Sequence, residues 1–158
     1  MRPFTTCLWF DGKAEEAVQF YASVFPDARI GHTARYGRNM PGKEGSVMTI
    51  ELELNGQKFL ALNAGPHFRF TPAISLMVNC ETQEEIDRYW QTLSEGGETQ
   101  QCGWLKDRFG VSWQVVPSDL PHLMGRASPA QSQKIMEAVM TMTKLDIATL
   151  KQAHDRAA

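Results

Sequence analysis

The sequence of 158 residues has few cysteines and no long apolar run. Its three cysteines, Cys7, Cys80 and Cys102, cannot all pair within one chain and form no CxxC motif. This set is typical of a reducing compartment rather than of a disulfide framework. No apolar run approaches the roughly 18 residues of a membrane span, and the first residues lack the apolar core of a signal peptide. We therefore predict a cytoplasmic protein with no membrane partner.

A strong charge of one sign is also missing. The formal net charge is -2, and the Lys and Arg residues are scattered rather than clustered. Because nucleic acids are bound through basic patches, we predict no nucleic-acid partner. Hydrophobic residues make up 42% and charged residues 22%, which is ordinary for a globular protein. The length suits a single domain over residues 1–158.

The first half of the chain predicts the order strand, helix, strand, strand, strand. Apolar residues recur at helical spacing over residues 13–25, and Pro26 ends that helix. Residues 46–54 alternate between apolar and polar side chains, and Asn55-Gly56 is a strong hairpin signal. The predicted strands are residues 4–10, 28–36, 46–54 and 57–63.

The second half repeats this order. Thr82 and Glu85 form a predicted capping box for a helix that ends at Gly96-Gly97, and the predicted strands are residues 73–79, 98–102, 104–106 and 111–116. Chance rarely produces the same order twice. We predict an α+β fold of two tandem βαβββ modules, residues 1–65 and 70–120. A C-terminal helical extension, residues 128–158, is expected to pack on its own domain and to add a dimer contact; a free binding helix is the alternative.

Three stretches resemble a known family: CLWFDGKAEEAVQFYASVFPDARI, FTPAISLMVNC and QQCGWLKDRFGVSWQVVP. They resemble the PhnB-like branch of the vicinal oxygen chelate superfamily, also called the 3-demethylubiquinone-9 3-methyltransferase domain and related to glyoxalase I and bleomycin-resistance proteins. The resemblance extends over nearly the whole chain, including KLDIATLKQA. It implies a curled mixed sheet around a pocket with helices outside, and a homodimer with the pocket near the subunit interface.

Strand alternation predicts which side chains face that pocket. Helices should cover the apolar face of the third strand, including Ile50 and Leu52, and Cys7 is expected beneath the first helix. The inward sets of the other strands also include Ala61, Ala73 and Met77. The predicted ligand pocket is lined by Thr6, Leu8, Phe10, Phe59, Asn63, Ser75, Trp104, Ser112 and Gln114.

The resemblance also implies where metal-dependent relatives hold their ion. Those positions correspond here to Thr6, Asn63, Ala73 and Gln114. Hydroxyl and carboxamide oxygens bind transition metals weakly, and alanine offers no donor atom. We therefore predict no metal and no other cofactor. The four histidines share no ligand spacing; His67, in the link between the modules, could border the pocket.

Two residues are candidate catalytic groups, Glu51 and Cys102. Glu51 shares a strand face with Glu53, and paired carboxylates can transfer protons when one is desolvated; two exposed glutamates on a sheet rim are the more common arrangement. Cys102 would need a lowered thiol pKa, with Lys106 the only close cation in sequence, so a small pocket-filling residue is the simpler interpretation. Residues 106–108 are predicted to form a charged hairpin tip.

These residues predict a small-molecule-binding protein, and whether it catalyses a reaction stays open. One alternative is methyl transfer to a ubiquinone precursor, as the family name suggests. Asp11-Gly12 is the only turn that could open a nucleotide site between a strand and a helix, and it is poor in glycine. Another alternative is a non-catalytic dimer that sequesters its ligand, as resistance proteins do.

Overall fold

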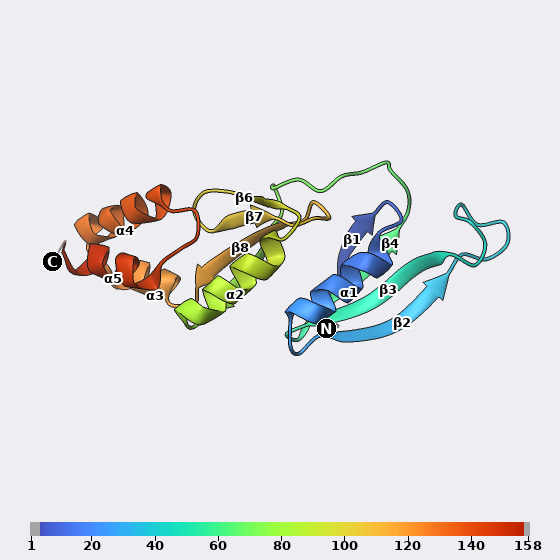
Figure 1. The fold of residues 1–158 in the computed structure, drawn as a ribbon, viewed down its shortest axis with the longest axis horizontal. Helices are drawn as coiled ribbons and strands as arrows, with labels where there is room; N and C mark the ends of the chain where they lie inside the picture. Colours follow the sequence, from blue (N-terminus) through green and yellow to red (C-terminus); the bar gives the residue numbers. More distant parts are fainter. Residues whose placement is uncertain (1–3, 157–158) are drawn as a thin grey trace. The chain divides into compact units, whose positions relative to one another are not determined.

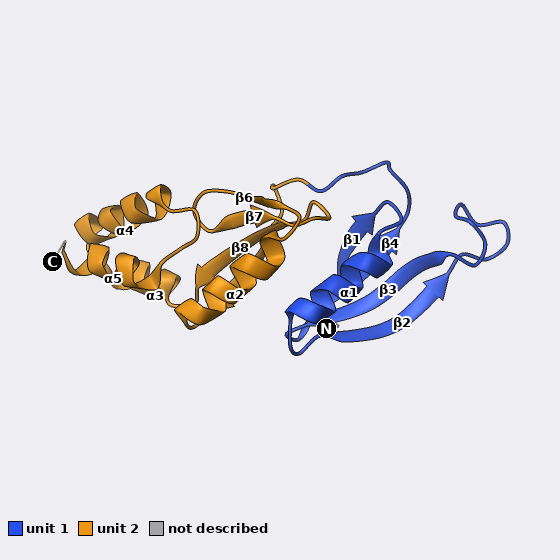
Figure 2. Ribbon diagram, viewed as in Figure 1, with its two compact units in different colours: residues 1–70 blue, residues 71–158 orange. Residues whose placement is uncertain are grey.

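The computed structural model describes residues 4–156 of the chain. The contacts divide the chain into two compact units, unit 1 over residues 1–70 and unit 2 over residues 71–158 (Figure 2). Unit 1 contains the first predicted module, and unit 2 contains the second module and the C-terminal extension. That the two units act as one domain stays a prediction.

Unit 1 is a four-stranded mixed sheet with one helix (Figure 1). Its elements are β1 (Thr6–Phe10), α1 (Ala14–Val24), β2 (Arg29–Arg35), β3 (Val47–Leu54) and β4 (Gln57–Asn63). The strand order is β1-β4-β3-β2, with β1 parallel to β4 and the other pairs antiparallel. Asn55 and Gly56 both have positive φ, 47° and 82°, which is the backbone of the predicted tight hairpin turn between β3 and β4.

Unit 2 repeats this topology. Its sheet contains β5 (Leu76–Cys80), β6 (Glu98–Thr99), β7 (Trp104–Lys106) and β8 (Ser112–Pro117), with α2 (Gln83–Ser94) packed on it. The order β5-β8-β7-β6 again pairs the first strand with the last in parallel. The α+β prediction of two βαβββ modules with helices outside is therefore confirmed. Within residues 4–156, however, each unit has its own four-stranded sheet, and neither closes or curls around a pocket.

The bounds of some elements differ from the prediction. The strand predicted at 73–79 begins at Leu76, so Ala73 and Ser75 precede β5. Thr82 caps α2 by accepting the Glu85 N–H, as predicted, but the Glu85 carboxylate accepts the N–H of Glu81 rather than that of Thr82. The capping box is thus completed one residue earlier in the chain.

The C-terminal extension packs against the end of β8 within unit 2. It contains α3 (Leu120–Arg126), which the sequence did not predict, α4 (Pro129–Thr141) and α5 (Ile147–Asp155). Buried apolar side chains join these helices to the end of β8: Val116, Ile135, Val139, Leu145 and Leu150. The predicted packing on its own part of the chain is confirmed. None of the helices described over residues 4–156 has both the length and the apolar character needed to cross a bilayer.

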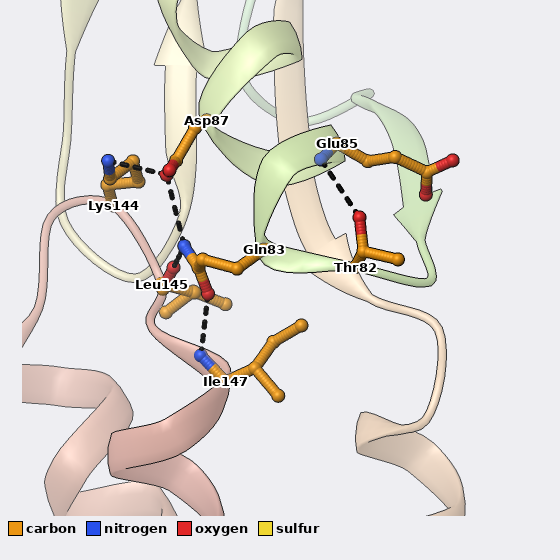
Figure 3. Close-up of polar contacts among 7 residues, drawn as sticks. All are labelled: Thr82, Gln83, Glu85, Asp87, Lys144, Leu145 and Ile147. Atoms are coloured by element: carbon orange, nitrogen blue, oxygen red, sulfur yellow. Dashed lines mark hydrogen bonds and ion pairs between the residues drawn. The ribbon is translucent and has the colours of Figure 1, made fainter.

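A polar clasp fixes the segment between α4 and α5 to the start of α2 (Figure 3). The Gln83 carboxamide donates to the Leu145 carbonyl at 3.1 Å and accepts the Ile147 N–H at 2.9 Å. The Lys144 ammonium lies 2.6 Å from the Asp87 carboxylate. Hydrogen bonds from Lys144 and Gln83 lower the pKa of Asp87. Because Gln83 of α2 makes two hydrogen bonds to the segment before α5, the extension is held by directional contacts as well as by apolar packing.

Candidate functional site

One face of the unit 1 sheet is covered by α1, and the strand register identifies it. Leu8 pairs with Ala61, which pairs with Ile50, so these three side chains lie on one side of the sheet. In the same way Thr6 and Phe59 lie on the side of Leu52. The exposed fractions of Leu8, Phe10, Phe59 and Ala61 are 7% or lower. Thr6, Leu8, Phe10 and Phe59 therefore lie on the side of the sheet that α1 covers, whereas the sequence predicted that they face away from the helix. Whether they contact a ligand stays a prediction.

The error has a physical reason. From Thr49 to Leu54 the third strand is apolar on one side only, so alternation predicts its faces correctly. In β1 and β4 both sides carry apolar residues, for example Leu60 beside Ala61, and alternation alone cannot say which side a helix covers. Cys7 was expected beneath the first helix for the same reason. It is instead exposed on the open face, which is the side of the unit 1 sheet that faces away from α1.

Asn63, the last residue of β4, connects strands to the start of α1. Its Oδ1 accepts the Ala14 N–H at 2.9 Å, and its Nδ2 donates to the Val47 carbonyl at 3.2 Å. The side chain thus supplies the cap that Lys13, the N-cap residue of α1, does not provide. Asn63 therefore has a structural role, and whether it also contacts a ligand stays a prediction.

The positions implied for a metal do not fit one. The Asn63 oxygen is already used by the α1 backbone, Ala73 has no donor atom, and Thr6 and Gln114 offer only neutral groups. Over residues 4–156, no three His, Cys, Asp or Glu side chains gather closely enough to hold an ion. The residues at these positions therefore lack the strong ligands that a transition metal needs.

The open face of the unit 1 sheet contains a hollow of about 410 Å³. It lies over β2, β3 and β4, and its lining combines both signs of charge with apolar groups: Thr5, Arg29, Gly31, Glu51, Leu52, Glu53, Lys58, Phe59 and Leu60. Phe59 and Leu52 are almost fully buried, so the side chains available to a ligand are chiefly the charged ones and Leu60.

Glu51, a predicted catalytic candidate, lies in this hollow and has a defined position. A Cβ on Gly31 would lie 2.8 Å from the Glu51 Oε2 atom, so the absence of a side chain there lets Glu51 lie across β2. The same oxygen faces the His32 N–H at 3.3 Å. Glu51 is nevertheless exposed, which agrees with the alternative of an exposed glutamate on a sheet rim.

A second hollow of about 660 Å³ lies at the carboxyl ends of β1 and β4. His67, which the sequence suggested as a pocket neighbour, lines it together with Trp9, Tyr36 and Asn63. The Tyr36 hydroxyl donates to the Asn63 carbonyl, and the Trp9 indole donates to the Gly65 carbonyl at 2.8 Å. These polar groups hold the surrounding loops together.

In unit 2 the predicted inward residues of β7 and β8 do share a face. Gln114 pairs with Met77 and Trp104, while α2 packs on the opposite face with Trp113 and Val115. The Gln114 carboxamide donates to the Ser75 hydroxyl at 2.9 Å, so these two predicted residues are brought together. Ser112 is on the same face but only 2% exposed. Ligand binding by this group stays a prediction.

Cys102 lies outside these hollows. It has a positive φ of 62°, donates its backbone N–H to the Met142 carbonyl at 2.8 Å, and packs against the apolar cluster of the C-terminal helices. This environment suits the predicted small filling residue, although the space that it fills is the C-terminal core rather than a pocket.

Asp107 was missed as a structural residue because its neighbours Lys106 and Arg108 made the segment look like an exposed tip. Its side chain is 2% exposed and accepts hydrogen bonds from the Val111 N–H and the Trp113 indole. The prediction of a charged tip is wrong for this residue.

The cysteines test the exposure of Cys7 on β1 of unit 1 against Cys80, which is buried in β5 of unit 2. Burial and, to a smaller extent, the Glu85 carboxylate raise the pKa of the Cys80 thiol to about 11, while partial burial raises the pKa of Cys7. A raised pKa leaves less thiolate at pH 8; for Cys80 the loss is about hundredfold. We expect iodoacetamide to alkylate Cys7 well before Cys80, as measured by peptide mass spectrometry. Faster labelling of Cys80 would contradict the exposure of Cys7 and the burial of Cys80. The urea-unfolded chain, in which both thiols should react alike, is the control.

Comparisons with known proteins agree with this fold. A family model described as 3-demethylubiquinone-9 3-methyltransferase matches residues 2–116. A PhnB protein from Bacillus cereus is 43% identical, with a TM-score of 0.67 over 73% of this chain and 99% of that chain. A Pseudomonas aeruginosa protein is 22% identical, with a TM-score of 0.61 over 73% and 96% of the two chains. No curated protein matches.

A fosfomycin resistance protein, FosX from Mesorhizobium loti, is 12% identical, with a TM-score of 0.55 over 79% of this chain and 98% of that chain. At this identity the likeness shows the fold alone. The family match ends at residue 116, so α3, α4 and α5 lie beyond it. The resemblance expected for KLDIATLKQA is not part of that match.

Proposed function

The chain belongs to the 3-demethylubiquinone-9 3-methyltransferase (PhnB-like) family, and from this premise we propose that it binds a small molecule on the open face of the unit 1 sheet. The observation that carries the proposal is the hollow of about 410 Å³ over β2, β3 and β4. Ligand sites in proteins usually occupy about 300–1,000 Å³ and combine apolar walls with a few polar groups. Leu60 provides an apolar wall, and Glu51 provides an oriented polar group.

Binding is better supported than methyl transfer. A nucleotide-like methyl donor is usually held where a glycine-rich turn leads from a strand into a helix. At that place in unit 1, the Ala14 N–H is already bonded to Asn63 and the Lys13 ammonium is paired with Glu16 at 2.7 Å, so both of these donors beside Gly12 are in use. We therefore propose noncovalent binding as the function, with the family's methyltransferase name as the alternative.

A fragment screen on the full chain tests this proposal. In ¹H–¹⁵N NMR spectra, fragments that bind should shift the amides of Glu51, Lys58 and Leu60 together. Leu60→Arg fills the open face and should abolish those shifts, whereas Thr33→Arg, an exposed position on β2 whose strand partner Ile50 lies on the other face, should not. Fragments that shift only other regions, or that bind Leu60→Arg equally well, would contradict the proposal.

A further inference from the structure

Three charged residues form one row across the open face of unit 1. Arg29 on β2 pairs with Glu53 on β3, and Glu53 pairs with Lys58 on β4. Directly paired residues project to the same side of a sheet, so two cations flank one carboxylate. All three line the hollow.

These charges are not used by the fold. Over residues 4–156, no ion pair within 4 Å involves Arg29, Glu53 or Lys58, and no side-chain hydrogen bond of these three residues is formed. Elsewhere on the same unit, exposed charges do pair, as Lys13 and Glu16 show at 2.7 Å. A bound ligand could therefore donate hydrogen bonds to Glu53 and accept them from Arg29 and Lys58.

The same face becomes apolar with distance from this row. Two residues further along β3, Glu51 pairs with Leu60, which pairs with Cys7. Two residues beyond that, Thr49 pairs with Leu62, which pairs with Trp9, and the Trp9 ring contacts Phe68 edge-on with centroids 4.9 Å apart. Two residues span about 6.6 Å along a strand, so the row of Leu60 begins about 6.6 Å from the charged row. A small molecule bound at the charged row can therefore contact Leu60.

We propose that the ligand of this face is a small zwitterion with an apolar body, such as an aromatic α-amino acid. This rests on the proposed function of the same hollow. The ligand's ammonium group lies at Glu53 and its carboxylate between Arg29 and Lys58, while its apolar body lies over Leu60 toward Trp9. Charge-assisted hydrogen bonds at both ends fix the orientation, and the apolar rows supply contact area.

The test compares four probes that share a phenyl ring on a two-carbon chain and differ in their charged groups. L-Phenylalanine has both groups, 3-phenylpropanoate lacks the ammonium group, 2-phenylethylamine lacks the carboxylate, and 2-phenylethanol lacks both. Dissociation constants are measured by NMR titration of the full chain. We expect L-phenylalanine to bind about tenfold more tightly than either singly charged probe, and 2-phenylethanol to bind most weakly.

Two variants assign the ends of the ligand. Glu53→Gln should weaken L-phenylalanine and 2-phenylethylamine about tenfold and leave 3-phenylpropanoate unchanged or improved. Lys58→Met should weaken L-phenylalanine and 3-phenylpropanoate instead. Glu44→Gln and Lys43→Met, which make the same charge changes in the exposed loop before β3, are the matched controls and should alter none of the four.

Equal binding of all four probes on the open face, or variants that match their controls, would overturn the zwitterion assignment and leave the proposed function in place. The assignment also fails if none of the four probes binds while library fragments do shift Leu60. If neither the probes nor the library shifts this face, the proposed function fails as well. A second copy of the chain or another segment covering the face would give that last result.

Discussion

Replacing Asp107 with alanine is expected to lower the free energy of unfolding of unit 2 by about 3 kcal/mol, because buried donors lose their acceptor. The Asp107 Oδ1 atom accepts the N–H groups of Phe109 and Val111 at 2.9 and 3.0 Å, and Oδ2 accepts the Trp113 indole at 2.8 Å. A buried unpaired polar group costs about 1–3 kcal/mol, and alanine leaves several of them.

The measurement is urea unfolding followed by tryptophan fluorescence. Asp119→Ala is the matched control, because Asp119 is exposed and its side chain makes no cap hydrogen bond at the start of α3. The control should change the free energy of unfolding by less than about 0.5 kcal/mol. A similarly small loss for Asp107→Ala would mean that its hydrogen bonds do not hold the β7–β8 connection.

Replacing Ile135 with alanine is expected to lower the stability of unit 2 by about 2–5 kcal/mol. Ile135 is 0% exposed at the centre of the cluster that joins α4 to Val116, Leu145 and Leu150. Removing its side chain leaves a cavity that the surrounding helices can fill only in part. The C-terminal extension would then detach from the sheet more readily.

Met136 offers an internal comparison, since it is the next residue of α4 and 46% exposed. Met136→Ala should change the urea midpoint little, while Ile135→Ala should shift it strongly. Equal effects would show that the extension does not share a core with the β8 end of the unit 2 sheet. Circular dichroism at 222 nm provides the readout, because α4 and α5 contribute much of the helix.

Sequence reasoning succeeded where each pattern had one interpretation. The alternation of Ile50 and Leu52 with Thr49 and Glu51 correctly assigned the faces of β3, and the turn at Asn55-Gly56 has the predicted backbone. The order of elements was sufficient to predict the repeated topology. In each case, local physical chemistry and tertiary packing favour the same structure.

It failed where the deciding information was nonlocal. Leu8 and Cys7 are both acceptable core residues, and only pairing with β4 decides which of them α1 covers. Asn63 looked like a pocket group because nothing in its neighbourhood in sequence shows that it caps a helix 49 residues away. The row formed by Arg29, Glu53 and Lys58 likewise arises only from strand register.

The most direct measurement of ligand binding on the open face is a set of intermolecular NOEs between L-phenylalanine ring protons and methyl-labelled full-length protein. Leu60 and Leu62 lie on the open face, and Leu8 and Ala61 lie on the face covered by α1. We expect NOEs to the Leu60 methyls, weaker ones to Leu62, and none to Leu8 or Ala61. NOEs to Leu8 or Ala61 without any to Leu60 would contradict binding on the open face.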